Sequence, residues 1–209
     1  MIPYTSRTGT RSTLAALKAA GWHLLVSATG KHRPEGLPYA IDNGAWTAHQ
    51  GGGAWDEEAF RAVVSALGAE ACFIVAPDIV AGGMRSFATS LEWVRTLHHH
   101  GLVLVPVQDG MSPAVVGPYF DEWTGIFVGG STEWKLATLD AWGAVAAERD
   151  CYLHVGRVNT RRRIRRCHTA GADSFDGTSP VKFPSTLPLL TRATNQLGFN
   201  LTHTKDDER

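Results

Sequence analysis

Short apolar runs alternate with amphipathic helical patterns along almost the whole chain, and this alternation restricts the possible folds. Eight runs predict strands, at 2–5, 23–27, 38–41, 72–76, 102–107, 125–128, 151–155 and 173–175. Helical patterns lie between most of them, at 11–20, 56–68, 84–99, 112–119, 133–149, 160–170 and 185–196. Strands joined by helices pair in parallel, because each helical crossover returns the chain to the end of the sheet where the previous strand began.

Two α/β architectures accept such a pattern, a closed (β/α)8 barrel and an open doubly wound sheet. The strand count favours the barrel, although 209 residues is near its lower limit. No GxGxxG follows the first run and no P-loop is present, which weakens the nucleotide-binding sheet. The connection between 27 and 38 has no helical pattern. We therefore expect a compact, slightly irregular barrel as one catalytic domain over 1–198, followed by a polar tail at 199–209.

Polar residues or glycines follow most of the predicted strands. They are Asp42, Asn43, Asp78, Gln108, Asp109, Gly129, Gly130, His154, Gly156 and Asp176. In a (β/α)8 barrel the carboxyl ends of the strands converge on the face that carries the chemistry. A single Asp after a strand is commonly only a turn or capping residue. As a set, however, the acidic residues and the glycine-containing turns favour a functional pocket.

The two acids of "DSFD" are expected to differ in role. A strand that runs through both places Asp173 and Asp176 on opposite faces. Asp173 lies near the start of the strand, where a structural hydrogen bond is the better expectation. Asp176 lies at the carboxyl end, with the other polar residues.

A flat, purine-like ring would fit such a pocket. A carboxylate beside an amide, as in Asp78 and Gln108, can pair with the donor and acceptor edge of a base. A Gly-Gly turn exposes backbone N–H groups and lets a ring approach closely. Trp46 and Trp134 each follow a strand end and are candidates for stacking, although packing in the core or at the rim is the alternative for both.

The chain has no formal net charge, but its arginines cluster after the seventh run. The segment "RVNTRRRIRR" contains Arg157, Arg161, Arg162, Arg163, Arg165 and Arg166. A local basic patch is typical of phosphate binding, and a solvated helix face is the alternative. Lys182, six residues after Asp176, is a second candidate for phosphate contact.

The three cysteines, Cys72, Cys151 and Cys167, are too widely spaced for a disulfide framework or a zinc site. Cys72 and Cys151 open apolar runs and are expected to be buried. We expect a cytoplasmic protein with no metal and no membrane span, because no signal peptide is visible and no apolar run is long enough.

The strand-end elements together resemble the tRNA-guanine transglycosylase superfamily. Most similar is the shorter branch that inserts 7-deazaguanine bases into DNA in bacteria and phages. The resemblance covers about residues 5–183 and rests on "DNGAW", "APDI", "VQDG", "FVGGSTEWK" and "DSFDGTSPVKF", with "YTSRTGTRSTLAAL" at the start. Each element is weak alone, and their order and spacing carry the likeness.

The resemblance implies a role for each strand-end residue. Asp176 would attack the anomeric carbon of a guanine nucleotide and form a covalent sugar–enzyme intermediate. Asp42 would act as general acid and base. Asp78 and Gln108 would recognise the base, with backbone groups presented by Gly129 and Gly130, and no cofactor is implied.

Two departures from the tRNA enzymes shape the expected substrate. Those enzymes carry a Cys-x-Cys-x-x-Cys…His zinc site after the barrel, and this sequence contains no such motif. We therefore expect DNA and a free 7-deazaguanine such as preQ0 as substrates. His154 is the second departure: it would orient a carboxylate, contact phosphate, or be a satisfied core histidine. Asn43 is a candidate for a supporting position.

The alternatives are the same exchange on tRNA, a hydrolytic N-glycosidase acting on a purine nucleotide, and a non-enzymatic binding module. A partner protein that supplies substrate contacts is compatible with the sequence. The oligomeric state stays open.

Overall fold

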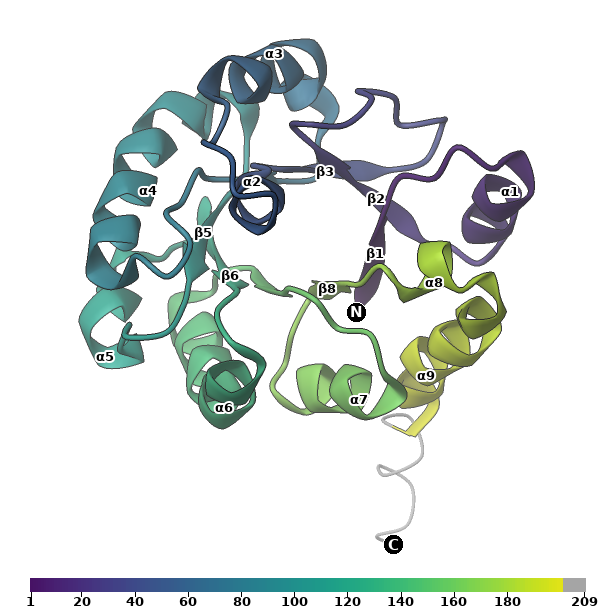
Figure 1. The fold of residues 1–209 in the computed structure, drawn as a ribbon. Helices are drawn as coiled ribbons and strands as arrows, with labels where there is room; N and C mark the ends of the chain where they lie inside the picture. The colour runs from purple at the N-terminus through teal and green to yellow at the C-terminus, as the bar shows by residue number, and fades with distance from the viewer. Residues whose placement is uncertain (201–209) are drawn as a thin grey trace, which may run out of the picture.

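A computed structural model shows a closed barrel of eight parallel strands in the order β1 to β8 (Figure 1). It describes the backbone of residues 1–200 and the side chains of residues 1–195. Residues 199 and 200 belong to the last helix, and the rest of the predicted tail at 199–209 lies outside the described residues. The predicted α/β barrel is confirmed.

All eight predicted strands are present, each within two residues of its predicted bounds. They are β1 (Ile2–Ser6), β2 (His23–Ser27), β3 (Tyr39–Asp42), β4 (Ile74–Val75), β5 (Val103–Val107), β6 (Thr124–Val128), β7 (Leu153–Val155) and β8 (Ser174–Asp176). Each pairs with the next in parallel, and β8 returns to β1 with Tyr4 beside Asp176. Closure leaves no free edge on this sheet.

Helices surround the barrel as an outer ring, and the short α2 lies inside that ring in this view (Figure 1). They are α1 (Arg11–Ala19), α2 (Ala45–Gln50), α3 (Glu57–Leu67), α4 (Gly83–Leu97), α5 (Pro113–Val116), α6 (Thr132–Arg149), α7 (Arg161–Thr169), α8 (Ser179–Lys182) and α9 (Leu187–Asn200). As predicted, β2 is joined to β3 by a loop without a helix. The sequence did not indicate α2 or α8, because each is too short to show a helical period.

Three helices begin at side chains that cap their free backbone N–H groups. The Asp56 carboxylate accepts a hydrogen bond from the backbone of Ala59 at the start of α3. Thr160 does the same at the start of α7, and Ser131 at the start of α6. These caps fix where the connections end, and therefore where the loops after β3, β6 and β7 can lie.

Two apolar layers hold the barrel together. The larger layer lies between the strands and the helices and includes Trp22, Phe60 and Trp142. The barrel interior is filled by a second cluster around Tyr4 and Phe73. The barrel is therefore a packed core, and the space for a ligand lies at its ends.

One prediction about burial was wrong. Cys151 is buried, but Cys72 is exposed. β4 begins only at Ile74, so Cys72 lies before the strand at the amino-terminal end of the barrel.

Helices α6 and α7 approach closely at Gly143. A β-carbon at this position would collide with the backbone carbonyl of Ala170. Overpacking of this kind costs typically about 1–3 kcal/mol. We expect Gly143→Ala to lower the melting temperature by about 2–4 °C for each kcal/mol lost.

Gly9→Ala is the matched control, because a β-carbon there meets no atom within 4 Å. Thermal unfolding followed by circular dichroism measures both variants. Equal melting temperatures for Gly143→Ala and Gly9→Ala would contradict the close helix contact.

Candidate active site

Three carboxylates gather at the carboxyl end of the barrel. Asp42 is the last residue of β3, Asp176 is the last residue of β8, and Asp78 follows β4. The negative charges of Asp176 and Asp78 both act on the Asp42 carboxyl. The structure therefore brings the three predicted acids into one site.

The Asp176 carboxylate is bound at both oxygens. Its Oδ1 accepts a hydrogen bond from the backbone N–H of Arg157 at 3.2 Å. Its Oδ2 lies 3.1 Å from Nε2 of His154. The side chain is 13% exposed. It is therefore fixed in direction and still open to the mouth of the barrel.

Asp173 has the structural role that strand alternation predicts. Its carboxylate accepts a hydrogen bond from the backbone N–H of Leu153 at 2.8 Å, which joins the start of β8 to the start of β7. Asp173 therefore stabilises the amino-terminal end of the barrel, whereas Asp176 lies in the site at the carboxyl end.

Asp42 has a strongly shifted acidity. Burial, together with the negative charges of Asp176 and Asp78, raises the pKa of Asp42 to about 7. A hydrogen bond from the backbone N–H of Gly44, at 3.3 Å, acts in the opposite direction. A carboxyl group with this pKa can both give and take a proton near neutral pH.

Asn43 holds the end of β4 against the end of β3. Its side-chain amide donates hydrogen bonds to the carbonyl of Ala76 at 2.7 Å and to Oδ1 of Asp78 at 2.9 Å. Burial raises the pKa of Asp78, and the Asn43 bond opposes that shift. Asn43 thus has the supporting position that the sequence suggested.

Gln108 is buried at the end of β5, at 4% exposure. Its side-chain amide donates to the carbonyl of Ile79 at 2.9 Å. This amide therefore binds the loop that carries Asp78.

The turn after β6 is held by Asp109. Its carboxylate accepts hydrogen bonds from the backbone N–H and the hydroxyl of Ser131, each at 2.6 Å. Burial acts to raise the pKa of Asp109, but these two bonds outweigh it and lower the pKa. A side chain at Gly130 would collide with Asp109 and with the ring of Trp134, and its φ of +66° also favours glycine. Glycine at position 130 is therefore required by packing and by its backbone conformation.

Arg157 links several parts of the mouth. Its guanidinium donates to the carbonyl of Gly130 and lies 4.3 Å above the ring of Trp46, while its backbone binds Asp176. Its φ is +59°, a strained value for a side-chain-bearing residue. Trp46, at 40% exposure, thus lies at the mouth. Trp134 instead packs against the core, with its ring 6.1 Å from that of Trp142.

Sequence reasoning missed Lys135 in the first turn of α6. This lysine is buried, and its ammonium group donates to the carbonyl of Gly156, next to Arg157. Burial and the charge of Arg157 lower the pKa of Lys135 to about 8. The signal was present, because Lys135 continues the buried stripe of Leu139, Trp142 and Ala146 on α6.

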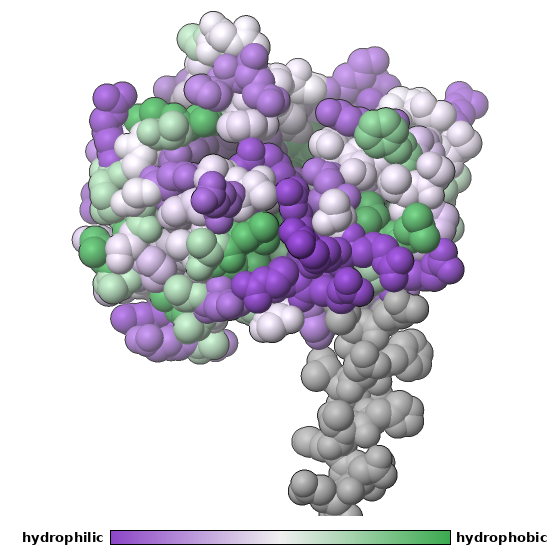
Figure 2. Space-filling model, turned by 60° about the horizontal axis from the view of Figure 1, so that its bottom comes forward, coloured by the Kyte–Doolittle hydropathy of each residue, from purple (hydrophilic) through white to green (hydrophobic). Residues whose placement is uncertain are grey.

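The remaining basic residues lie outside the barrel mouth. Arg161 and Arg162 are exposed in the first turn of α7, Arg163 is half-buried, and Lys182 is exposed at the end of α8. Arg166 pairs with Asp140 at 3.0 Å. Figure 2 shows a hydrophilic band across the face that carries α7. The cluster therefore forms a surface beside the site and is not part of the core.

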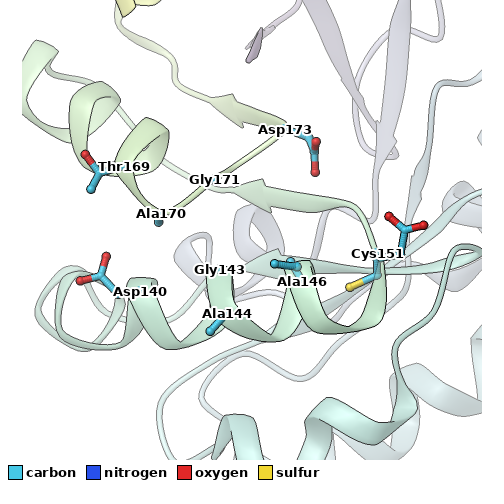
Figure 3. A pocket seen from close by; sticks show the side chains of 11 residues that line it. Asp140, Gly143, Ala144, Ala146, Cys151, Thr169, Ala170, Gly171 and Asp173 are labelled. Carbon is cyan, nitrogen blue, oxygen red and sulfur yellow. The ribbon is translucent and has the colours of Figure 1, made fainter. Parts of the chain in front are cut away.

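A cavity of about 530 Å³ lies elsewhere, between α6 and the turn from α7 into β8 (Figure 3). Its wall is formed by small residues and by Asp140, Asp150 and Asp173. Apart from the α6 residues 140–147, these positions lie where α6 and α7 end and β7 and β8 begin. The cavity is thus at the opposite end of the barrel from Asp42 and Asp176.

No known protein family matches this sequence, and a search of curated proteins finds no match either. Among the described residues, no cluster of three or more His, Cys, Asp or Glu side chains could hold a metal ion. None of the described helices is long and apolar enough to cross a membrane.

The acidity of Asp42 makes the stability of the fold depend on pH. The pKa of Asp42 is about 7 in the folded protein, against about 4 in an unfolded chain. The folded state therefore binds this proton more tightly, and the contribution of Asp42 to stability falls as pH rises from about 4 to about 7. We expect Asp42→Asn to raise the melting temperature at about pH 8 and to raise it clearly less at about pH 5, because only part of the unfavourable contribution is present there.

Glu58→Gln, on the exposed side of α3, is the control for loss of one negative charge. Thermal unfolding at both pH values gives the comparison. If Asp42→Asn and the wild type keep a constant difference in melting temperature across this range, the raised pKa is wrong.

Proposed function

We propose that this chain is a base-exchange transglycosylase that replaces guanine in DNA with a 7-deazaguanine such as preQ0. The observation that carries the proposal is the pairing of two carboxyl groups with different properties in one site. Asp176 is held by two hydrogen bonds, and Asp42 has its pKa raised to about 7. Two carboxyl groups in different environments can serve as nucleophile and as acid–base group.

The first half of the reaction removes guanine. An oxygen of Asp176 attacks the anomeric carbon, and the bond from that carbon to the base breaks with its electron pair going to the base. Asp42, protonated for part of the time at neutral pH, gives its proton to the leaving base. The sugar is then held as an ester of Asp176.

The second half inserts the new base. The Asp42 carboxylate takes the proton from the ring nitrogen of the incoming 7-deazaguanine, and that nitrogen attacks the anomeric carbon. The ester bond breaks and returns Asp176 as a carboxylate. Acid–base assistance of this kind contributes about 10²–10⁴-fold. No bond energy has to be supplied by ATP, because one glycosidic bond replaces another.

In this proposal the base is recognised by residues at the neighbouring strand ends. Asp78 is oriented by Asn43, and Gln108 lies next to it at the end of β5. We expect the polar edge of guanine to bind there and to displace the Gln108 amide from the Ile79 carbonyl. Trp46 would stack on a base at the mouth, where the Arg157 guanidinium now lies above its ring.

In this proposal DNA binds to the basic surface beside the site. A target nucleotide has to leave the base stack before Asp176 can reach its sugar, which costs a few kcal/mol. Arg161 and Arg162 are exposed at the start of α7, where the helix dipole also favours phosphate. The proposal locates this reaction in the cytoplasm of a bacterium or a phage-infected host.

We expect Asp176→Asn to abolish base exchange while the domain stays folded. The assay supplies labelled preQ0 or guanine with duplex DNA, single-stranded DNA or tRNA, and follows incorporation of the label. Asp173→Asn, on the same strand, is the control for a structural defect. It should lower stability and retain activity.

Each outcome of this assay separates the candidate reactions. Wild-type turnover by Asp176→Asn would contradict the nucleophile. Label that enters tRNA but not DNA would replace the proposed substrate, and guanine release without incorporation would indicate a hydrolase.

We expect Arg161→Ala/Arg162→Ala to weaken DNA binding and to flatten its salt dependence. Each phosphate contact contributes about 0.9 to the slope of log affinity against log salt concentration, so the slope should fall by about 1–2. Fluorescence anisotropy at several salt concentrations measures it.

Arg95→Ala/Arg149→Ala is the charge-matched control, because these arginines lie at the carboxyl ends of α4 and α6, at the other end of the barrel. An unchanged slope in the α7 variant would mean that its arginines are only a solvated helix face.

A further inference from the structure

His154 is fully buried inside the barrel, at 0% exposure, and both of its ring nitrogens have polar partners. Nε2 lies 3.1 Å from Oδ2 of Asp176, and Nδ1 lies 2.7 Å from the hydroxyl oxygen of Ser174. This burial removes phosphate contact from the roles considered for His154.

The strand register brings these three side chains together. His154 lies beside Ser174 in the pairing of β7 with β8. Ser174 and Asp176 are two residues apart on β8, so both point to the same face. The imidazole ring therefore lies between the Ser174 hydroxyl and the Asp176 carboxylate, and Asp176 is at the carboxyl end of β8.

Aromatic contacts fix the orientation of the imidazole ring. It stacks on Phe127 with a centroid distance of 4.8 Å and an interplanar angle of 21°. Phe73 and Tyr4 lie against it from other strands, at 5.1 Å and 5.8 Å. A ring packed in this way cannot turn without disturbing the core.

The hydrogen bonds can be assigned a direction from the chemistry of the partners. A carboxylate only accepts hydrogen bonds, so Nε2 has to carry the proton that points at Asp176. In a neutral imidazole, Nδ1 is then an acceptor, and the Ser174 hydroxyl donates to it. The Asp176 carboxylate thus selects the Nε2-protonated tautomer, and the Ser174 hydroxyl supports it by donating to Nδ1.

We propose that His154 is a positioning residue that, in the Nε2-protonated tautomer supported by Ser174, holds the Asp176 carboxylate in its attacking orientation. The backbone N–H of Arg157 holds the other oxygen, so rotation of the carboxylate is opposed at both ends. The kinetic consequence rests on the proposed function, whereas the tautomer and the hydrogen bonds do not. A misplacement of about 1 Å at a reacting group can cost about 10²-fold in rate.

Nuclear magnetic resonance of ¹⁵N-labelled histidine tests the assignment without any substrate. We expect Nε2 of His154 to carry a proton and Nδ1 to accept a hydrogen bond, with the signals of this ring identified by their loss in His154→Gln. Asp176→Asn should shift the Nε2 signal, and Ser174→Ala should shift the Nδ1 signal. Protonation at Nδ1, or an Nε2 signal that ignores Asp176→Asn, would overturn the proposal.

Kinetics test the positioning role with two substitutions. His154→Leu removes the donor, whereas His154→Gln keeps an N–H donor at a similar distance from the backbone. We expect His154→Leu to lower kcat by about 10²-fold with little change in KM, and His154→Gln to recover at least part of the loss. His23→Leu is the control, because His23 also packs on Tyr4 and makes no contact with Asp176.

The outcomes separate this proposal from the proposed function. Equal losses of kcat in His154→Leu and His154→Gln, with both variants folded by circular dichroism, would contradict positioning. A wild-type protein that exchanges no base on DNA or tRNA would contradict the proposed function. In that case the resonance experiment would still decide whether Ser174 and His154 orient Asp176.

Discussion

Parallel pairing between β1 and β8 closes the barrel, with Ile2 beside Ser174 and Tyr4 beside Asp176. The backbone N–H of Gly177 donates to the carbonyl of Tyr4 at 3.1 Å, which extends this contact just beyond the strand. Closure brings the carboxyl ends of all eight strands to one mouth. Asp42 and Asp176 are far apart in the sequence and meet only because of this closure. The site is therefore a property of the closed sheet and not of any local motif.

Three carboxyl groups lie close together at the mouth of the barrel. The raised pKa of Asp42 and the hydrogen bonds around Asp176 follow from burial and from this concentration of negative charge. Burial and mutual repulsion raise the pKa of Asp42 to about 7, so it keeps a proton for part of the time at neutral pH. His154 and the backbone of Arg157 hold Asp176. Lys135 donates a hydrogen bond to the carbonyl of Gly156, the residue before Arg157. The unusual groups of this site thus support one another through the loop between β7 and α7.

The sequence predicted the fold and the strand-end residues because both depend on local patterns. Strand and helix periods are short-range, and an Asp at the end of a strand has only one end of a parallel barrel to occupy. It could not predict partners. Such partners depend on loop geometry and on the register between strands. Examples are the binding of Gln108 to Ile79, the packing of Trp134 on Trp142, and the position of Arg157 over Trp46. His154 was ambiguous for the same reason, since its role is decided by where Ser174 and Asp176 lie across the sheet.

Asp176 is proposed to form a bond to the sugar, and isolation of the covalent complex tests this step. Wild-type protein is incubated with guanine-containing DNA in the absence of added base, quenched in denaturant, digested with protease and nuclease, and analysed by mass spectrometry. We expect a deoxyribose-linked adduct on the peptide that contains Asp176. Fragmentation should place the adduct on that residue, and the adduct should be lost when preQ0 is added before the quench. An adduct on any other residue, or guanine release with no adduct under these conditions, would contradict it.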